Sequence, residues 1–369
     1  MTFDLRYVRT GELESYIHSD EYSSHGFVAI SHSRAVSHAR NPRADKDDIA
    51  LILAYDAEKF IGYLGMIPEL VFTENKKIKV CWLSCMWVLP EYRRSGIATH
   101  LLSDAHRIYK GLVFITNYIP RSKAAFFKSG HYIEIVKLYG VRAYLRFDLA
   151  TILPRRNQYL KWIKPLLTMI DIFLNTLISI NDRKKLNRIE LYNSYELMDK
   201  IDGETGKFID RAIQTNPFRR SRKEFEWMKK HPWVTPVKDN TIDYRRYYFS
   251  QHSPDFKQWF IRIRNDDNQM VGFMILTRHK HELKTPYIIA PKEIYGDIFL
   301  FIRQLMINEN IPTLVTYQEY LSEHIKHNGK YFITIRHAEY GFIATKEIEK
   351  LLNGKYGKLY DGDGDGAFT

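Results

Sequence analysis

The sequence predicts an α+β protein built from two copies of one unit. Each half contains an apolar strand, a polar turn and a second apolar strand with an internal glycine, written "DDIALILAYDAEKFIGYLGMI" in the first half and "KQWFIRIRNDDNQMVGFMIL" in the second. In both halves a further apolar stretch leads to a proline, Pro90 or Pro291, and a helix with apolar residues at 3.6-residue spacing follows. Gly130 and Gly329 then stand in equivalent turns. This near-constant spacing indicates an internal repeat.

The repeat sets the expected domain boundaries. We expect a first α+β domain over residues 1–148, a helical connector over 149–190, a second α+β domain over 191–360, and an acidic Gly/Asp tail over 361–369. With 45% hydrophobic and 14% aromatic residues, the chain can bury a core in each domain.

Three features bear on where the protein works. The charged start of the chain does not read as a signal peptide. Cys81 and Cys85, the two cysteines, would lie too far apart in a strand to form a disulfide, so we expect a cytoplasmic protein. Residues 160–180 are strongly apolar, but charged residues interrupt them, so the uninterrupted length falls short of a spanning helix. Two readings stay open for this segment: a packed connector, or an interfacial helix resting on the anionic inner face of a membrane.

The stretch most informative about chemistry is "VCWLSCMWVLPEYRRSGIATHLL", residues 80–102. An apolar strand ends at Pro90, a basic turn follows, and a helix begins near Gly96. Backbone N–H groups at a helix start lack internal partners and carry the positive end of the helix dipole, which suits a phosphate. Gly96 lets the backbone approach an anion, and Arg93 and Arg94 add positive charge. A formal net charge of +12 also favours an anionic ligand.

This stretch resembles the acetyl-CoA-binding motif of the GNAT N-acyltransferases, Val-x-Pro-x-x-Arg-x-x-Gly-x-Gly/Ala followed by an apolar helix. The element order expected over residues 1–148 is similar to that fold. The resemblance implies acetyl-CoA as co-substrate, an amine as acceptor and no metal. The matching residues are Val88, Pro90, Arg93, Gly96, Ala98, Leu101 and Leu102.

The resemblance also implies particular contacts. Backbone amides from Arg94 to Thr99 would bind the pyrophosphate, and Met86 and Val88 would pair with the pantetheine arm beside a splay between neighbouring strands. Asn117 falls in a second segment that is similar to the family. The cofactor-binding residues so implied are Met86, Val88, Arg93, Arg94, Ser95, Gly96, Ile97, Ala98, Thr99 and Asn117.

The second copy lacks these cofactor-binding residues. Ile294 stands in place of Arg93, Asp297 in place of Gly96, and Phe299 in place of Ala98. A carboxylate would repel a pyrophosphate, and a phenylalanine would block the turn. We therefore expect the second copy to keep the fold without the cofactor.

Catalytic groups are harder to place. Many members of the family carry a carboxylate on the strand before the motif, where this chain has Ser84, and a tyrosine where it has Phe126. Tyr118, Glu69 and His131 are the nearby substitutes for a general base or acid, and solvent could also serve. Cys85 could carry an acyl group as a nucleophile, but its apolar strand favours a packing thiol.

The tail "DGDGDGAFT" holds three aspartates. A calcium loop needs a bidentate acid at its twelfth position, which the chain does not reach, so we expect no metal. A flexible solvated tail is one reading. In the other, the apolar "AFT" anchors a tail folded back between the domains, where Asp363 and Asp365 bind the acceptor or supply the missing base.

Tandem chains of this length resemble bacterial acyltransferases of surface-polysaccharide synthesis, which implies an amino sugar on a nucleotide or lipid diphosphate as acceptor. Two alternatives stay open: a peptidoglycan-type aminoacyltransferase that uses aminoacyl-tRNA, and a non-catalytic CoA-binding or membrane scaffold. In the basic segment 217–233, Phe225, Trp227 and Met228 recur at helical spacing. This favours a solvated basic helix face over a nucleic-acid surface.

Overall fold

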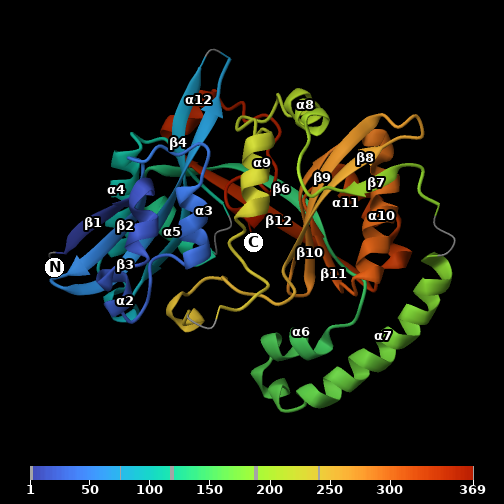
Figure 1. Cartoon of the computed structure of the whole chain (residues 1–369). Helices are drawn as coiled ribbons and strands as arrows, with labels where there is room; N and C mark the ends of the chain where they lie inside the picture. Colours follow the sequence, from blue (N-terminus) through green and yellow to red (C-terminus); the bar gives the residue numbers. More distant parts are fainter. Residues whose placement is uncertain (1–2, 75, 117–119, 187–189, 240–241, 369) are drawn as a thin grey trace. The chain divides into compact units, whose positions relative to one another are not determined.

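The computed structural model describes the chain except residues 1–2, 75, 117–119, 187–189, 240–241 and 369 (Figure 1). The chain divides into two compact units, each assembled from segments distant in sequence. Unit 1 comprises Met1–Leu138, Asp199–Gln258 and Tyr340–Thr369, and unit 2 comprises Tyr139–Met198 and Trp259–Glu339.

Unit 1 is built on a mixed sheet with strand order β1-β2-β3-β4-β5-β12. The first four strands form an antiparallel meander, β5 runs parallel to β4, and β12 pairs antiparallel with β5. The strands are β1 Asp4–Arg9, β2 Ile49–Asp56, β3 Lys59–Phe72, β4 Lys77–Val88, β5 Val113–Ile115 and β12 Thr334–Thr345.

Helices cover both faces of this sheet. On one face α4 presents Ile97, Leu101 and Leu102 to a core that includes Ile52 and Ala54 of β2. On the other face the residues between them on β2, such as Leu51, pack with the segment from α1 to α3. The helices of unit 1 are α1 Leu13–Tyr16, α2 Asp20–Ser24, α3 His32–Ala39, α4 Ile97–Ile108, α5 Pro120–Lys128, α8 Gly203–Ala212, α9 Arg222–Lys230 and α12 Lys346–Leu352, with short 3₁₀ turns η1 Thr10–Glu12, η2 Pro90–Tyr92, η4 Tyr244–Arg246 and η7 Gly366–Phe368.

Unit 2 has a sheet of order β6-β11-β10-β9-β8-β7, in which β10 and β11 are parallel. Helix α10 lies between these two strands in sequence, as α4 lies between β4 and β5 in unit 1. The elements are β6 Tyr132–Tyr144, α6 Leu149–Arg156, η3 Gln158–Lys161, α7 Lys164–Leu186, β7 Ser194–Leu197, β8 Lys257–Arg264, β9 Met270–His279, β10 Glu282–Ile289, η5 Lys292–Ile294, α10 Tyr295–Asn308, β11 Thr313–Thr316, α11 Glu319–His327 and η6 Gly329–Tyr331.

These units do not follow the linear boundaries expected at 148, 190 and 360. The last strand of each repeat crosses over: residues 340–345 of β12 belong to unit 1, where Ile343 pairs with Ile115, and residues 139–144 of β6 belong to unit 2, where Tyr144 pairs with Thr313. Residues 199–258 also join unit 1. A pattern that repeats along the chain cannot show that its closing strands are exchanged.

In unit 2 the turn before α10 is occupied by the protein itself. The Asp297 carboxylate accepts hydrogen bonds from the backbone N–H groups of Tyr192 and Asn193, at 2.9 and 3.1 Å, and from the Tyr195 hydroxyl at 2.8 Å. Phe299 is buried in the core of the unit. The two residues expected to exclude a pyrophosphate therefore have structural partners.

Helix α7 has its polar and apolar sides reversed relative to an ordinary surface helix. Buried Asp171 accepts hydrogen bonds from the backbone N–H groups of Leu149 and Ala150, both at 2.9 Å. Asp182 pairs with Arg146 at 2.6 Å and Arg303 at 3.0 Å. The exposed side chains, by contrast, are mostly large and apolar: Leu166, Met169, Ile170, Ile172, Phe173, Leu177 and Ile180. Within the part of the chain that the structure describes, no helix combines the length and apolar character needed to span a bilayer.

Candidate functional site

The turn before α4 has the geometry expected of an anion cradle. Gly96 is the N-cap of α4 with φ of 95°, a left-handed conformation that favours glycine. Arg94 is also left-handed, with φ of 70°. The Ser95 hydroxyl donates to the Tyr92 carbonyl at 2.6 Å and fixes the loop. The side chains of residues 93–95 are exposed, so the loop and the first N–H groups of α4 present one positive, accessible surface.

Arg93 lies back against the strand that precedes the turn. Its Nε donates to the Val88 carbonyl at 3.0 Å, and its guanidinium carbon lies 4.6 Å from the centre of the Trp87 ring. Val88, expected to pair with a pantetheine arm, thus already accepts one hydrogen bond. A carbonyl oxygen has a second lone pair, so this contact is compatible with the expected one.

A bulge interrupts the pairing of β4 with β3 next to this turn. Gly65 of β3 pairs with Ser84 and Tyr63 pairs with Trp87, so two residues of β4, Cys85 and Met86, lie opposite one residue of β3. Cys85 has φ of 53°. The described pairing between β4 and β5 ends at Leu83 and Ile115, although β4 continues to Val88. The register would next pair residues 85–87 of β4 with residues 117–119, which lie outside the described part of the chain, so the strand separation expected beside the motif stays a prediction.

Arg34 of α3 contacts the bulge from the other face of the sheet. Its Nη1 lies 2.8 Å from the Cys85 Sγ and 3.4 Å from the Ser84 Oγ, and its guanidinium stacks on the Trp233 ring at 4.2 Å. The side chain is buried. Burial alone would lower the pKa of the guanidinium, but Cys85, Tyr247, Asp365 and Tyr63 raise it above its usual value. The guanidinium of Arg34 therefore lies beside Ser84, the residue at the position where many members of the family carry a carboxylate.

The acidic tail is folded into unit 1. The Phe368 ring is fully buried, stacked on Trp233 with ring centres 4.5 Å apart and edge-on to Trp227 at 4.8 Å. The backbone N–H of Trp233 donates to the backbone carbonyl of Phe368 at 3.3 Å. The "AFT" segment is therefore an apolar anchor, and the solvated-tail reading is wrong for residues 361–368.

Two tail aspartates have different surroundings. Asp363 is fully buried, and its Oδ2 accepts from Asn216 Nδ2 at 2.8 Å and from the Tyr360 N–H at 2.9 Å. Asp365 is half-buried, and its Oδ1 accepts from the Thr116 hydroxyl at 3.0 Å, at the end of β5. Asp365 thus lies at the end of β5, and it also acts electrostatically on Arg34.

A glycine is needed between these two aspartates. Gly364 has φ of 75°, and a Cβ there would lie 2.9 Å from the Thr116 Oγ1 and 3.0 Å from the Trp82 ring. The alternation of aspartate and glycine therefore reflects a tight turn packed against β4 and β5, not a metal loop. Among the residues that the structure describes, no cluster of three or more His, Cys, Asp or Glu side chains could hold a metal.

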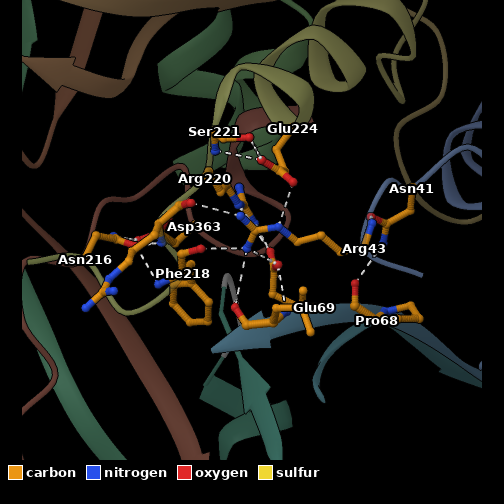
Figure 2. A network of polar contacts seen from close by, with 12 residues as sticks. Asn41, Arg43, Pro68, Glu69, Asn216, Phe218, Arg220, Ser221, Glu224 and Asp363 are labelled. Carbon is orange, nitrogen blue, oxygen red and sulfur yellow. Dashed lines mark hydrogen bonds and ion pairs between the residues drawn. The ribbon is translucent and has the colours of Figure 1, made fainter. Parts of the chain in front are cut away.

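Glu69 lies in a buried network of charges (Figure 2). Its Oε1 is 2.6 Å from Arg43 Nη1, and its Oε2 is 3.1 Å from Arg220 Nη2. Arg43 Nε also reaches Glu224 at 2.9 Å. The two glutamates raise the pKa of Arg43 against the effect of burial, and Arg43 in turn lowers the pKa of Glu224. Both carboxylate oxygens of Glu69 are engaged by buried guanidiniums, so these contacts favour a structural role for Glu69.

The same network holds the tail. Arg220 Nη1 donates to the Gly362 carbonyl at 3.0 Å and its Nη2 donates to the Gly364 carbonyl at 3.3 Å. Arg43 donates to the carbonyls of Phe218 and Arg219 at 2.6 and 3.0 Å. In the basic segment 217–233, Phe225, Trp227 and Met228 are buried as the helical spacing predicts, but Arg220 is buried with them.

The remaining predicted residues do not join this site. His131 stacks on His106 with ring centres 4.1 Å apart, near the last turn of α4. A helix of this length spans about 18 Å, so His131 lies far from the Gly96 turn. Tyr118 and Asn117 lie outside the described residues. Arg34, Tyr63 and Tyr247 were missed, because a single arginine or tyrosine in the sequence carries no sign of its distant neighbours.

The Glu69 network predicts a stability effect. Replacing Glu69 with Gln should lower the free energy of unfolding by about 3–5 kcal/mol, because Arg43 and Arg220 would stay buried with one counter-charge removed. Urea denaturation measures this, and Glu58→Gln, at a side chain that is 95% exposed, is the matched control. A Glu69→Gln protein as stable as the wild type but without activity would instead make Glu69 catalytic.

Comparisons with known proteins agree with this geometry. Residues 9–127 match the model of the Acetyltransferase (GNAT) family. No curated protein matches the chain. A conserved protein of unknown function from Enterococcus faecalis V583, described as a probable N-acyltransferase, has a similar fold, with a TM-score of 0.52 at 8% identity over 95% of this chain and 75% of that one.

Two further structures are more distant. A GCN5-related N-acetyltransferase from Anabaena variabilis has a TM-score of 0.47 at 11% identity over 92% of this chain and 72% of its own. Saccharomyces cerevisiae N-myristoyltransferase with bound myristoyl-CoA has a TM-score of 0.48 at 8% identity over 93% and 79%. The matched residues, 9–127, include the turn before α4 and the bulge in β4, and this segment is similar to a GNAT acetyltransferase family domain.

Proposed function

We propose that this protein is an acetyl-CoA-dependent N-acyltransferase whose donor site is the turn before α4. The observation that carries the proposal is an accessible loop at a helix N-terminus, with Arg94 and Gly96 left-handed, that follows a strand with a bulge at Cys85 and Met86. The loop and the N–H groups up to Thr99 would hold the pyrophosphate. The bulge at Cys85 and Met86 would face the thioester. We also propose that the protein consists of two similar domains in tandem, because the order strand, helix, strand of β4, α4 and β5 recurs in β10, α10 and β11 of unit 2.

We assign the general base to Asp365. Acyl transfer to an amine needs a group that takes the proton from the attacking nitrogen. Asp365 lies at the end of β5, held by Thr116, in the sheet position next to the strand that usually supplies the carboxylate. Asp363 is fully buried in structural hydrogen bonds, so of the two tail aspartates Asp365 is the better placed to meet a substrate.

The acceptor we propose is an amino sugar carried on a nucleotide or lipid diphosphate. The support for it is the excess of positive charge, a formal +12, which suits an anionic acceptor as well as CoA. An aminoacyl-tRNA-dependent reaction is the alternative, and it would not need the intact pyrophosphate turn.

The face of α7 supports a second proposal, peripheral binding to an anionic membrane. Trp162 and Phe173 are 82% and 65% exposed. Arg156, Lys161 and Lys164 are exposed at the same end of the α6–α7 segment as Trp162. Exposed apolar side chains with aromatic and basic residues at one end are typical of helices that lie in a membrane interface.

The donor site predicts the effect of one substitution. Gly96→Asp should abolish detectable binding of acetyl-CoA in calorimetry, because it places a carboxylate against the pyrophosphate in a left-handed position. Gly203→Asp is the matched control: it makes the same change at the start of α8, where a Cβ meets nothing within 4 Å. Unchanged affinity in Gly96→Asp would refute the donor site.

The assignment of Asp365 predicts a split between catalysis and stability. Asp365→Asn should lower kcat by about 10²- to 10⁴-fold, as expected for loss of a general base, and leave the affinity for acetyl-CoA unchanged. Thiol release from acetyl-CoA with a panel of amino-sugar nucleotides measures kcat. The Asp363→Asn control should lower thermal stability instead. Equal kcat in wild type and Asp365→Asn would remove Asp365 from the mechanism.

The membrane proposal is tested with vesicles. Wild-type protein should co-sediment with vesicles that contain phosphatidylglycerol and not with neutral ones, and serine at Trp162, Phe173 and Leu177 should abolish this. Serine at Tyr192, Leu197 and Val237, which are equally exposed elsewhere, should not. Wild-type protein that ignores the anionic vesicles would contradict the proposal.

A further inference from the structure

We propose that Cys85 carries the acyl group as a covalent thioester between donor and acceptor. The inference rests on the proposed donor site and deepens it, since it gives the reaction two chemical steps in place of direct attack by the amine. It also revises the sequence interpretation of Cys85 as a packing thiol.

The position of Cys85 is the first support. It lies in the β4 bulge, next to Met86, where the thioester would sit, and its left-handed backbone aims the side chain toward α3. Cys85 is half-buried. Cys81, four residues earlier on the same strand, is fully buried, and burial raises the pKa of its thiol well above the usual value.

The second support is the cation in contact with the sulfur. The thiolate is the nucleophilic form of cysteine, and a neighbouring arginine stabilises it. Arg34 Nη1 lies 2.8 Å from Cys85 Sγ, and the Ser84 hydroxyl donates to the same sulfur at 3.4 Å. Arg34 is buried, and Cys85 and Asp365 are among the groups that raise the pKa of its guanidinium, so the cation is held against the sulfur.

The third support is a pair of buried hydroxyl groups beside the thiol. Tyr63 and Tyr247 are buried and pack in the same cluster as Cys85. Burial raises the pKa of both phenols, the charge of Cys85 raises both further, and a side-chain hydrogen bond with Cys85 also raises that of Tyr247. Within the described part of the chain the Tyr63 hydroxyl has no hydrogen-bond partner. A buried donor without an acceptor is costly, so the Tyr63 hydroxyl is placed to donate to a group that arrives at Cys85, such as the carbonyl oxygen of an acyl group.

The two steps balance without any other reagent. In the first, the Cys85 thiolate attacks the carbonyl carbon of the acyl-CoA, the new C–S bond forms to Sγ, and the bond to the CoA sulfur breaks; the CoA thiolate leaves and takes a proton from solvent. In the second, the acceptor amine attacks the Cys85 thioester, its proton passes to Asp365, and the Sγ–C bond breaks. The thiolate then returns to its contact with Arg34.

The test uses the full chain and acetyl-CoA without acceptor. After acid quenching, intact-mass spectrometry should show the addition of one acetyl group per chain, and peptide mapping should place it on Cys85. Neutral hydroxylamine should remove it, which separates a thioester from acetylated lysine. Cys85→Ser should not form this adduct, whereas Cys81→Ser should form it as the wild type does. Adding an active amine acceptor should discharge it.

The outcomes separate the two proposals. If acetyl-CoA binds in calorimetry but the wild-type chain forms no hydroxylamine-sensitive adduct, the covalent step is wrong and the acyltransferase proposal stands. An adduct that persists in Cys85→Ser also overturns the assignment. If acetyl-CoA does not bind at all, the proposed function fails, and this inference fails with it.

Discussion

The shared carboxylate of Glu69 is the interaction on which the rest of unit 1 depends. Glu69 extends from β3, Arg43 follows α3, and Arg220 precedes α9, so one glutamate joins three segments that are distant in sequence. Buried charges are costly unless each is paired and hydrogen-bonded. Here two arginines meet two glutamates, and the remaining N–H groups donate to backbone carbonyls. The network therefore specifies where residues 216–224 and the tail must lie.

Once the tail is held, the candidate site is complete. Arg220 binds the carbonyls on either side of Asp363, and Trp233 and Phe368 close the far end. This brings Asp365 to the end of β5 and places Trp233 beneath the guanidinium of Arg34. The groups that could perform chemistry thus come from segments distant in sequence: Arg34 contacts Cys85, and Asp365 acts electrostatically on Arg34.

The sequence predicted what short-range patterns can carry. The Gly96 turn follows from glycine and from a helix start, and the burial of Leu101 and Leu102 follows from helical spacing. The anchoring of "AFT" was also predictable from one apolar residue after an acidic run. In each case the physical cause lies within a few neighbouring residues.

Long-range pairing was not predictable in the same way. Nothing near Glu69 in the sequence indicates that Arg43 and Arg220 will share it, and the exchange of β6 and β12 leaves the repeat pattern unchanged. The contact between Cys85 and its basic neighbour, Arg34, could not be predicted for the same reason, because Arg34 lies on α3. Such contacts depend on the assembled fold.

Hydrogen exchange of the backbone amides tests the central claim most directly. If the turn before α4 is the acyl-CoA site, saturating acetyl-CoA should slow exchange of the amides from Arg94 to Thr99 and leave the corresponding amides around Asp297 and Phe299 unchanged. Equal exchange at Arg94–Thr99 with and without acetyl-CoA would contradict the account.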